Sequence, residues 1–222
     1  MLLDERIATQ NKIIEQYKSL IKALTDQTII DLLNGAMVTF EQMYTEAGEG
    51  GTPSTSNAKY YDGGTIPFIK IEDLSGKYLR SNKDYITQQG LNKSSAWIIP
   101  SNSVIYSNGA TIGAISINTY PVTTKQGILG IVPRDSVSTE YLYYLMSSTY
   151  FQKEVARIIT EGTMKTAYLK DINRIRCPLP SRIIQDRISA TLSLVSSVIE
   201  IENAALDGYR KAKRYLLRML FI

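Results

Sequence analysis

Few side chains in this sequence are able to do covalent chemistry, and none of them has a catalytic spacing. The 222 residues include no histidine and one cysteine, Cys177. The lack of histidine excludes His-based catalytic triads, His metal ligands and the usual proton shuttle near neutral pH. One cysteine cannot build a thiolate zinc site or an internal disulfide. Ser107 and Cys177 also lack a visible base partner that would activate a nucleophile, so we predict a binding protein rather than an enzyme.

The glycine-rich and acidic stretches do not change this prediction. Neither 48–51 (GEGG) nor 109–113 (GATIG) has the Lys-Ser/Thr end of a phosphate-binding loop. Glu72 and Asp73 are adjacent carboxylates, which are more typical of a solvated turn than of a catalytic pair. A fused nuclease or methyltransferase stays open as an alternative, and an S-adenosylmethionine-binding assay would test it.

Composition limits the class of partner and the compartment. The net charge of +4 and the isoelectric point near 9.0 weakly favour an anionic partner and count against an acidic DNA mimic. The sequence contains no run of about 18 apolar residues, so we predict no membrane-spanning helix. Asp4, Glu5 and Arg6 precede a polar-striped pattern that is unlike a signal peptide. Together with the single cysteine, these features lead us to expect a cytoplasmic protein.

Two long helical patterns flank the middle of the chain. In the C-terminal segment, alternating steps of four and three residues form an apolar seam that only two charged residues interrupt. Its positions are Ile188, Leu192, Val195, Ile199, Glu202, Leu206, Tyr209, Lys213, Leu216 and Leu220. The same rule in the N-terminal segment gives Ile7, Gln10, Ile14, Tyr17, Ile21 and Leu24. We predict an antiparallel coiled-coil arm; the alternative is that both helices pack on the central domain.

The middle of the chain has the pattern of a mixed α/β domain. Short apolar runs bounded by Gly, Pro, Asn or Ser predict strands at 66–71, 103–106, 114–117 and 128–132. A helix is expected at 138–160, with Ser138 or Thr139 as its N-cap and Glu140 in its first turn. The predicted class is α+β: an N-terminal helical arm at 1–34, a mixed α/β domain at 35–180 and a C-terminal helix at 181–222.

Six segments of this sequence, taken in order, form a recognisable pattern. They are 50–57 (GGTPSTSN) with 66–69 (IPFI), 100–105 with 109–113, 124–127 (TKQG), 141–145 (YLYYL), 162–165 (GTMK), and 178–180 (PLP) leading to 185–188 (QDRI). This series resembles the target recognition domain of type I restriction–modification specificity subunits. Lys125 replaces the family's usual Asn, and Asn102 replaces a common Gly. One recognition domain is found where the family usually has two, so the chain resembles a half-subunit.

The resemblance implies a non-catalytic, sequence-specific DNA-binding subunit with one target recognition domain, which lies at 35–180. Such a domain reads one half of a split double-stranded DNA target for a partner methyltransferase subunit and, in the full complex, a motor nuclease subunit. S-adenosylmethionine is expected in the methyltransferase subunit and no cofactor in this chain. Two-fold pairing through the arms, as a homodimer or with another half-subunit, would supply the second reader and favour an interrupted palindrome as target. The alternative is a structural adaptor that no longer reads DNA.

Loop residues are the expected DNA contacts, since phosphates take Lys, Arg, Ser, Thr or backbone N–H and base edges take Asn, Gln, Arg or Lys. The candidates are Thr52, Ser54, Thr55, Ser56, Ser107, Asn108, Thr111, Lys125, Gln126, Thr163 and Lys165. Any of them can instead be a turn residue that bonds its own backbone. A further basic loop holds Lys77, Arg80 and Lys83. The expected dimer or partner interface is the seam of Ile188, Leu192, Val195, Ile199, Leu206, Tyr209, Leu216 and Leu220.

Overall fold

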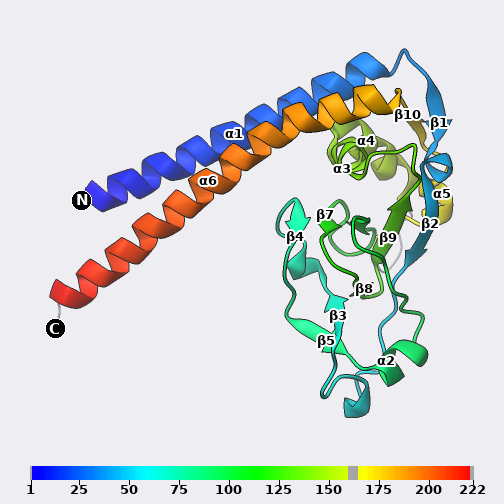
Figure 1. Cartoon of the computed structure of the whole chain (residues 1–222), viewed down its shortest axis with the longest axis horizontal. Coiled ribbons are helices and arrows are strands. Elements are labelled where there is room, and N and C mark those ends of the chain that lie inside the picture. The colour runs from blue at the N-terminus through cyan, green and yellow to red at the C-terminus, as the bar shows by residue number, and fades with distance from the viewer. Residues whose placement is uncertain (1, 160–164, 221–222) are drawn as a thin grey trace. The chain divides into compact units, whose positions relative to one another are not determined.

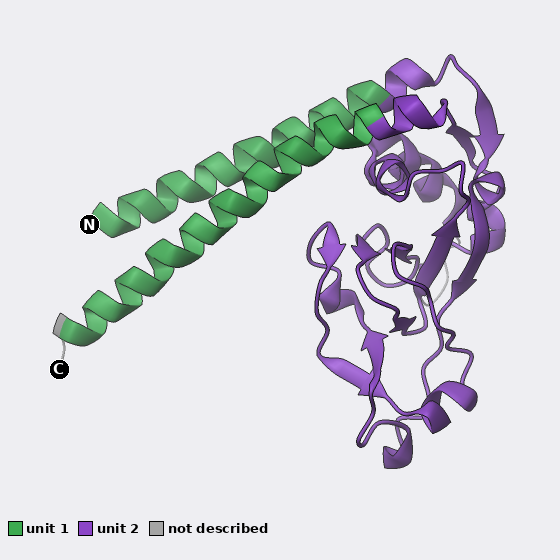
Figure 2. Cartoon of the chain, viewed as in Figure 1, with its two compact units in different colours: residues 1–28, 187–222 green, residues 29–186 purple. Residues whose placement is uncertain are grey.

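The chain folds into two compact units, each of which we describe by itself (Figure 2). The structure is a computed structural model and describes residues 2–159 and 165–220. One unit comprises 1–28 and 187–222, and the other comprises 29–186. Long helices stand at both ends of the chain and the strands lie between them, which confirms the predicted α+β class. None of the helices in the described part has a stretch both long and apolar enough to cross a membrane.

The helical unit pairs α1 (Leu2–Leu32) with α6 (Arg182–Leu220), which run side by side in opposite directions (Figure 1). Lys213 donates to Asp4 near the free ends, and the Gln10 side-chain amide donates to the Glu202 carboxylate and, at 3.2 Å, to its backbone carbonyl. These pairs fix the antiparallel register. The two long helices and their pairing are therefore as predicted.

A five-stranded sheet forms the centre of the other unit. Its strand order is β2-β9-β6-β7-β4, and only the β4–β7 pair is parallel. The strands are β2 (Tyr44–Glu49), β9 (Ile128–Pro133), β6 (Val104–Ser107), β7 (Ile115–Asn118) and β4 (Tyr78–Leu79). β6 lies inside the sheet and all four of its residues are buried, which explains why its sequence is apolar without alternation.

Two smaller sheets complete the strand framework. One has the order β5-β3-β8, made of β5 (Asp84–Ile86), β3 (Ile66–Ile69) and β8 (Thr123–Thr124). The other pairs β1 (Met37–Thr39) with β10 (Arg176–Pro178), so residues far apart in sequence close the unit on itself. Short helices connect the strands: η1 (Phe40–Met43), η2 (Ala58–Tyr60), η3 (Ile71–Asp73), α2 (Gln88–Asn92) and α5 (Leu169–Ile172).

The helix predicted at 138–160 is two helices, so this prediction was wrong in one respect. α3 (Thr139–Ser147) ends at Ser148, which has extended backbone angles and caps α4 (Thr149–Ile158) by accepting from the Phe151 N–H. Ser148 is fully buried, and its hydroxyl donates to the Leu145 carbonyl at 2.6 Å. One serine therefore satisfies backbone groups of both helix ends at the break.

Apolar side chains between the sheets form the core that fixes the loops at the strand ends. Ile69, Ile99, Ile105, Val122 and Ile128 are fully buried in one cluster. A second contact group is aromatic: Phe151 packs against Phe40 and Tyr106, with ring centroids 5.4 and 6.3 Å apart. Strands β6, β8 and β9 thus end on a rigid base.

Candidate nucleic-acid interface

The loop after β2 passes so close to the end of β8 that only glycine fits there. The Gly50 N–H donates to the Ile128 carbonyl at 2.9 Å, and the Gly51 N–H donates to the Thr124 carbonyl at 3.1 Å. A Cβ on Gly50 would stand 2.1 Å from the Thr124 carbonyl oxygen. The Gly-Gly pair is therefore needed for this contact, and it directs the 52–56 segment past the 125–127 turn.

The 125–127 turn is held from two sides. Gly127 has a φ of 84°, which favours glycine, and its N–H donates to Oε1 of Glu49 at 2.7 Å. The Gln126 N–H donates to the Thr52 hydroxyl at 3.3 Å, and the Lys125 N–H donates to the Ile69 carbonyl at 2.9 Å. With their backbone fixed, Lys125 and Gln126 present exposed side chains to solvent.

Asn108 joins two further loops to this turn. Its backbone N–H donates to the Gly127 carbonyl at 3.1 Å, and its carbonyl accepts from the Ala167 N–H at 2.9 Å. Its side-chain amide donates to the Ala167 carbonyl at 3.1 Å. Four segments of the chain, around 52, 109, 126 and 167, therefore meet at one place.

A cavity of about 370 Å³ lies where these segments meet. Its walls combine acceptors, donors and an aromatic ring with apolar surface such as that of Ile71 and Ala110. They are formed by Glu49, Thr52, Ile71, Gly109, Ala110, Lys125, Gln126, Gly127, Thr166 and Tyr168. The exposed cationic side chain of Lys125 and the exposed amide of Gln126 in this wall suit an anionic, hydrogen-bonding partner.

The structure brings together only part of the predicted DNA-contact set. Thr52, Lys125 and Gln126 line the cavity. Thr111 and Lys165 are exposed on the same loops but do not line it. Ser54, Thr55 and Ser56 are exposed, and the hydroxyls of Ser54 and Ser56 bond each other at 2.8 Å. Thr163 lies outside the described residues.

Ser107 and Asn108 are placed differently from the prediction. Both are 0% exposed, so neither side chain reaches a ligand from this position. Ser107 belongs to β6, and Asn108 has the structural role of joining the loops. In the described part of the chain, the Ser107 hydroxyl and the Asn108 Oδ1 have no hydrogen-bond partner. We therefore correct the assignment of both residues as DNA contacts: their side chains are buried, and that of Asn108 supports the loops.

Sequence reasoning missed most of the cavity wall, including two side chains able to bind a ligand, Glu49 and Tyr168. Glu49 ends β2 just before the Gly-Gly pair, and Tyr168 is the N-cap residue of α5. The Tyr168 side chain is 46% exposed, and the Lys170 ammonium stands 5.5 Å from its ring centroid. In the sequence, this pair of an exposed ring and a cation is visible only as a Tyr-x-Lys spacing, which is a weak signal.

Lys77 differs from the other two cations of the basic loop at 77–83, Arg80 and Lys83, which are exposed. The Lys77 side chain is 6% exposed and forms an ion pair with Glu140. Its ammonium donates to the Tyr144 hydroxyl at 2.9 Å and lies 4.6 Å from that ring's centroid. Lys77 therefore ties the edge of the large sheet to α3 and is not a solvated cation.

The predicted interface seam of α6 divides into three groups by exposure. Leu192 and Leu206 are buried in the single chain. Ile188, Val195, Ile199 and Tyr209 are half-buried, and Leu216 is 48% exposed. The side chain of Leu220 lies outside the described residues. Buried Leu192 and Leu206 offer no free surface, so a partner contact on α6 has to use its exposed positions.

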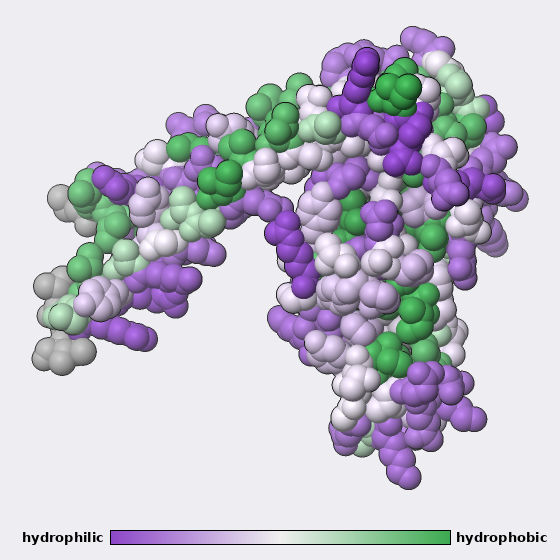
Figure 3. All heavy atoms as spheres, in the orientation of Figure 1, coloured by the Kyte–Doolittle hydropathy of each residue, from purple (hydrophilic) through white to green (hydrophobic). Residues whose placement is uncertain are grey.

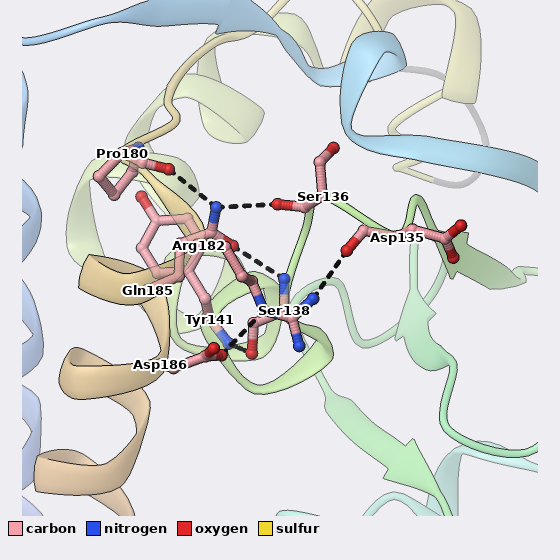
Figure 4. A network of polar contacts seen from close by, with 8 residues as sticks. All are labelled: Asp135, Ser136, Ser138, Tyr141, Pro180, Arg182, Gln185 and Asp186. Atoms are coloured by element: carbon pink, nitrogen blue, oxygen red, sulfur yellow. Dashed lines mark hydrogen bonds and ion pairs between the residues drawn. The ribbon is translucent and has the colours of Figure 1, made fainter.

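The first turn of α6 is anchored by Gln185, which is 1% exposed (Figure 4). Its Oε1 accepts from the Ser138 N–H at 2.8 Å. Its Nε2 donates to the carbonyls of Pro180 at 2.9 Å and Ser136 at 3.1 Å. Beside it, Arg182 bonds the Asp186 carboxylate and the Asp135 carbonyl. The glutamine side chain thus joins the start of α6 to the N-cap of α3.

Comparisons with known proteins found a matching family model and several relatives of similar sequence. The sequence model described as "Type I restriction modification DNA specificity domain" matches residues 44–207. The chain is 31% identical over 183 residues to the type I restriction enzyme MjaIX specificity subunit of Methanocaldococcus jannaschii, covering 80% of this chain and 41% of the relative. It is 26% identical over 180 residues to the EcoR124I/EcoR124II specificity subunit of Escherichia coli, covering 78% and 45%. The chain thus spans less than half the length of these relatives.

Solved structures of low sequence identity have the same fold. The HsdS subunit from Thermoanaerobacter tengcongensis superposes with a TM-score of 0.61 at 18% identity, covering 99% of this chain and 55% of that one. The type I restriction-modification S subunit from M. genitalium gives a TM-score of 0.68 at 14% identity, covering 100% and 58%. Among the residues that the structure describes, no three His, Cys, Asp or Glu side chains group to hold a metal ion.

Proposed function

Because the chain belongs to the type I restriction modification DNA specificity domain family, we propose that it binds double-stranded DNA sequence-specifically through the loops around the cavity. The observation that carries this proposal is the meeting of four loops at one cavity with Thr52, Lys125 and Gln126 in its wall. Lysine supplies the phosphate contact, and glutamine supplies paired donors and acceptors for a base edge. The net charge of +4 also favours an anionic partner such as DNA.

We propose further that the chain is the non-catalytic part of a larger assembly. It reads one half of a split target and directs a partner methyltransferase subunit, which holds S-adenosylmethionine, and a motor nuclease subunit in the full complex. The names of the relatives, which are specificity subunits of type I restriction enzymes, support this division of labour. We place the assembly in the cytoplasm, where its DNA is.

Reconstitution with the methyltransferase subunit from the same genome tests this function. The chain, that subunit and labelled S-adenosylmethionine are combined on a DNA library, and each protein alone serves as the control. We expect adenine methylation at one discrete motif only in the mixture. Methyl transfer by the chain alone would contradict the non-catalytic role. A mixture that assembles but methylates no motif, with equal affinity for all duplexes, would favour the structural adaptor instead.

A further inference from the structure

Glu49 is an acidic side chain in the wall of a cavity whose other ionic wall group is cationic. It ends β2, where it pairs in register with Leu129 of β9, so its backbone is fixed by the large sheet. Its Oε1 accepts from the Gly127 N–H at 2.7 Å. In the part of the chain that the structure describes, Glu49 has no Lys or Arg nitrogen within 4 Å. The carboxylate is therefore oriented by one backbone donor and is not neutralised by an ion pair.

A carboxylate at this place would weaken DNA binding if the surface contacted only the phosphate backbone. A carboxylate accepts hydrogen bonds and donates none, so it repels the phosphate backbone and attracts only donors. On the base edges of a duplex major groove, the donors are the exocyclic amino groups of cytosine N4 and adenine N6. An oriented carboxylate among DNA-contacting loops thus distinguishes amino-bearing bases from guanine and thymine, which present O6 and O4 acceptors there.

The neighbouring groups in the cavity suit this task. Lys125 and Gln126 precede Gly127, whose N–H donates to the Glu49 carboxylate. The same turn therefore carries the lysine and orients the carboxylate. Ile71 and Tyr168 contribute apolar and aromatic wall surface. A base edge that enters between them loses its water. In such a site a hydrogen bond to a charged group is stronger than in water, so a base that cannot form it binds less well.

We propose that Glu49 is a specificity-determining residue, whose free carboxylate oxygen accepts a hydrogen bond from the exocyclic amino group of a cytosine or adenine at one position of the target. This inference rests on the proposed DNA-recognition function. Gly127 holds the second oxygen and fixes the orientation of the carboxylate. Lys125 supplies a cation for the phosphate backbone next to the base that Glu49 reads.

Selection of duplexes from a random library by the full chain tests the proposal, with the parent and Glu49→Gln compared. Glutamine keeps an oxygen for the Gly127 N–H and replaces the free carboxylate oxygen with an amide donor. Every base pair carries one amino-bearing base, so the informative result is the change: we expect E49Q to lose or alter the preference of the parent at one base pair of the motif. The other positions are unchanged, and affinity for the parent motif falls roughly tenfold.

Glu46→Gln is the matched control, since it removes the same charge from the same strand. Glu46 is exposed and lies three residues away, so its side chain leaves the opposite face of β2. We expect its motif to equal that of the parent. A parent motif retained by E49Q contradicts the inference alone. Equal loss at every position in a folded E49Q chain, checked by thermal melting, also overturns it, because it indicates a structural role. A parent chain that selects no motif contradicts the proposed function itself.

Discussion

Cys177 lies in β10, where it pairs with Val38 of β1 and is 0% exposed. Burial raises the pKa of its thiol from 9.0 to about 12, since the apolar surroundings disfavour the thiolate. Above pH 9 the unfolded chain therefore releases a proton that the folded chain retains. The unfolded state then binds fewer protons, so the free energy of unfolding must fall as pH rises from 9 toward 12.

This linkage gives a prediction for alkaline unfolding. Between pH 8 and pH 10, we expect the parent to lose about 1 kcal/mol more unfolding free energy than Cys177→Ala. Urea unfolding of both proteins at the two pH values measures the difference. Tyrosines whose pKa is raised by partial burial, such as Tyr143 at about 12, are common to both proteins, so their contributions cancel. Equal pH slopes for the two proteins would contradict the account of the buried thiol.

Residue types alone predicted the exposed half of the candidate site but not the buried half. Lys125 and Gln126 follow β8 within a Thr-Lys-Gln-Gly turn, whose sequence indicated a loop. Asn108 has equally suitable chemistry, yet it is buried because three loops need its backbone and amide groups. Burial depends on which segments meet in space, and that information lies in long-range contacts rather than in local spacing.

At the scale of elements, the start of α6 depends on the Gln185 side chain. We predict that Gln185→Leu lowers the free energy of unfolding by about 2–3 kcal/mol, because it leaves the Ser138 N–H and two carbonyls without their partner. Asp186→Asn is the control, since that carboxylate is exposed and its pair with Arg182 is worth about 1 kcal/mol or less. Equal urea midpoints for the two variants would show that the network adds little.

Elements with strong apolar patterns were predictable, and those made by tertiary contacts were not. The strands expected at 66–71, 103–106, 114–117 and 128–132 correspond to β3, β6, β7 and β9. β2 was missed because Glu46, Gly48 and Glu49 interrupt its apolar pattern, although it pairs along most of β9. The break at Ser148 was also missed, since Ser-Ser-Thr within an apolar helical pattern is a weak stop signal.

For the whole molecule, the helical unit offers apolar surface that the single chain does not cover. Leu194 and Ile201 of α6 are seven residues apart, Tyr215 follows fourteen residues later, and the three are 70%, 66% and 63% exposed. Figure 3 shows hydrophobic atoms along the helices on the face turned to the viewer. Spacing by multiples of seven residues places these side chains on one stripe, so we expect a second helix pair or a partner helix to bind there.

We therefore predict that the chain forms a dimer through this stripe. The double variant Leu194→Glu with Ile201→Glu should be monomeric in light scattering and retain its helical circular dichroism. Thr191→Glu with Asn203→Glu adds the same charge at exposed polar positions of α6 and should stay dimeric. A parent chain that is monomeric at all tested concentrations would contradict this mode of assembly.

The central claim, that the loops around the cavity read DNA, is tested most directly by the ratio of affinities for a selected and a random duplex. This ratio is measured at two salt concentrations for the parent, Lys125→Ala and Gln126→Ala. The account predicts that K125A weakens binding to both duplexes alike and lowers the salt slope by about one. It predicts that Q126A loses roughly 1–3 kcal/mol on the selected duplex and little on the random one. If both variants bind both duplexes as the parent does, these loops are structural turns and the claim is wrong.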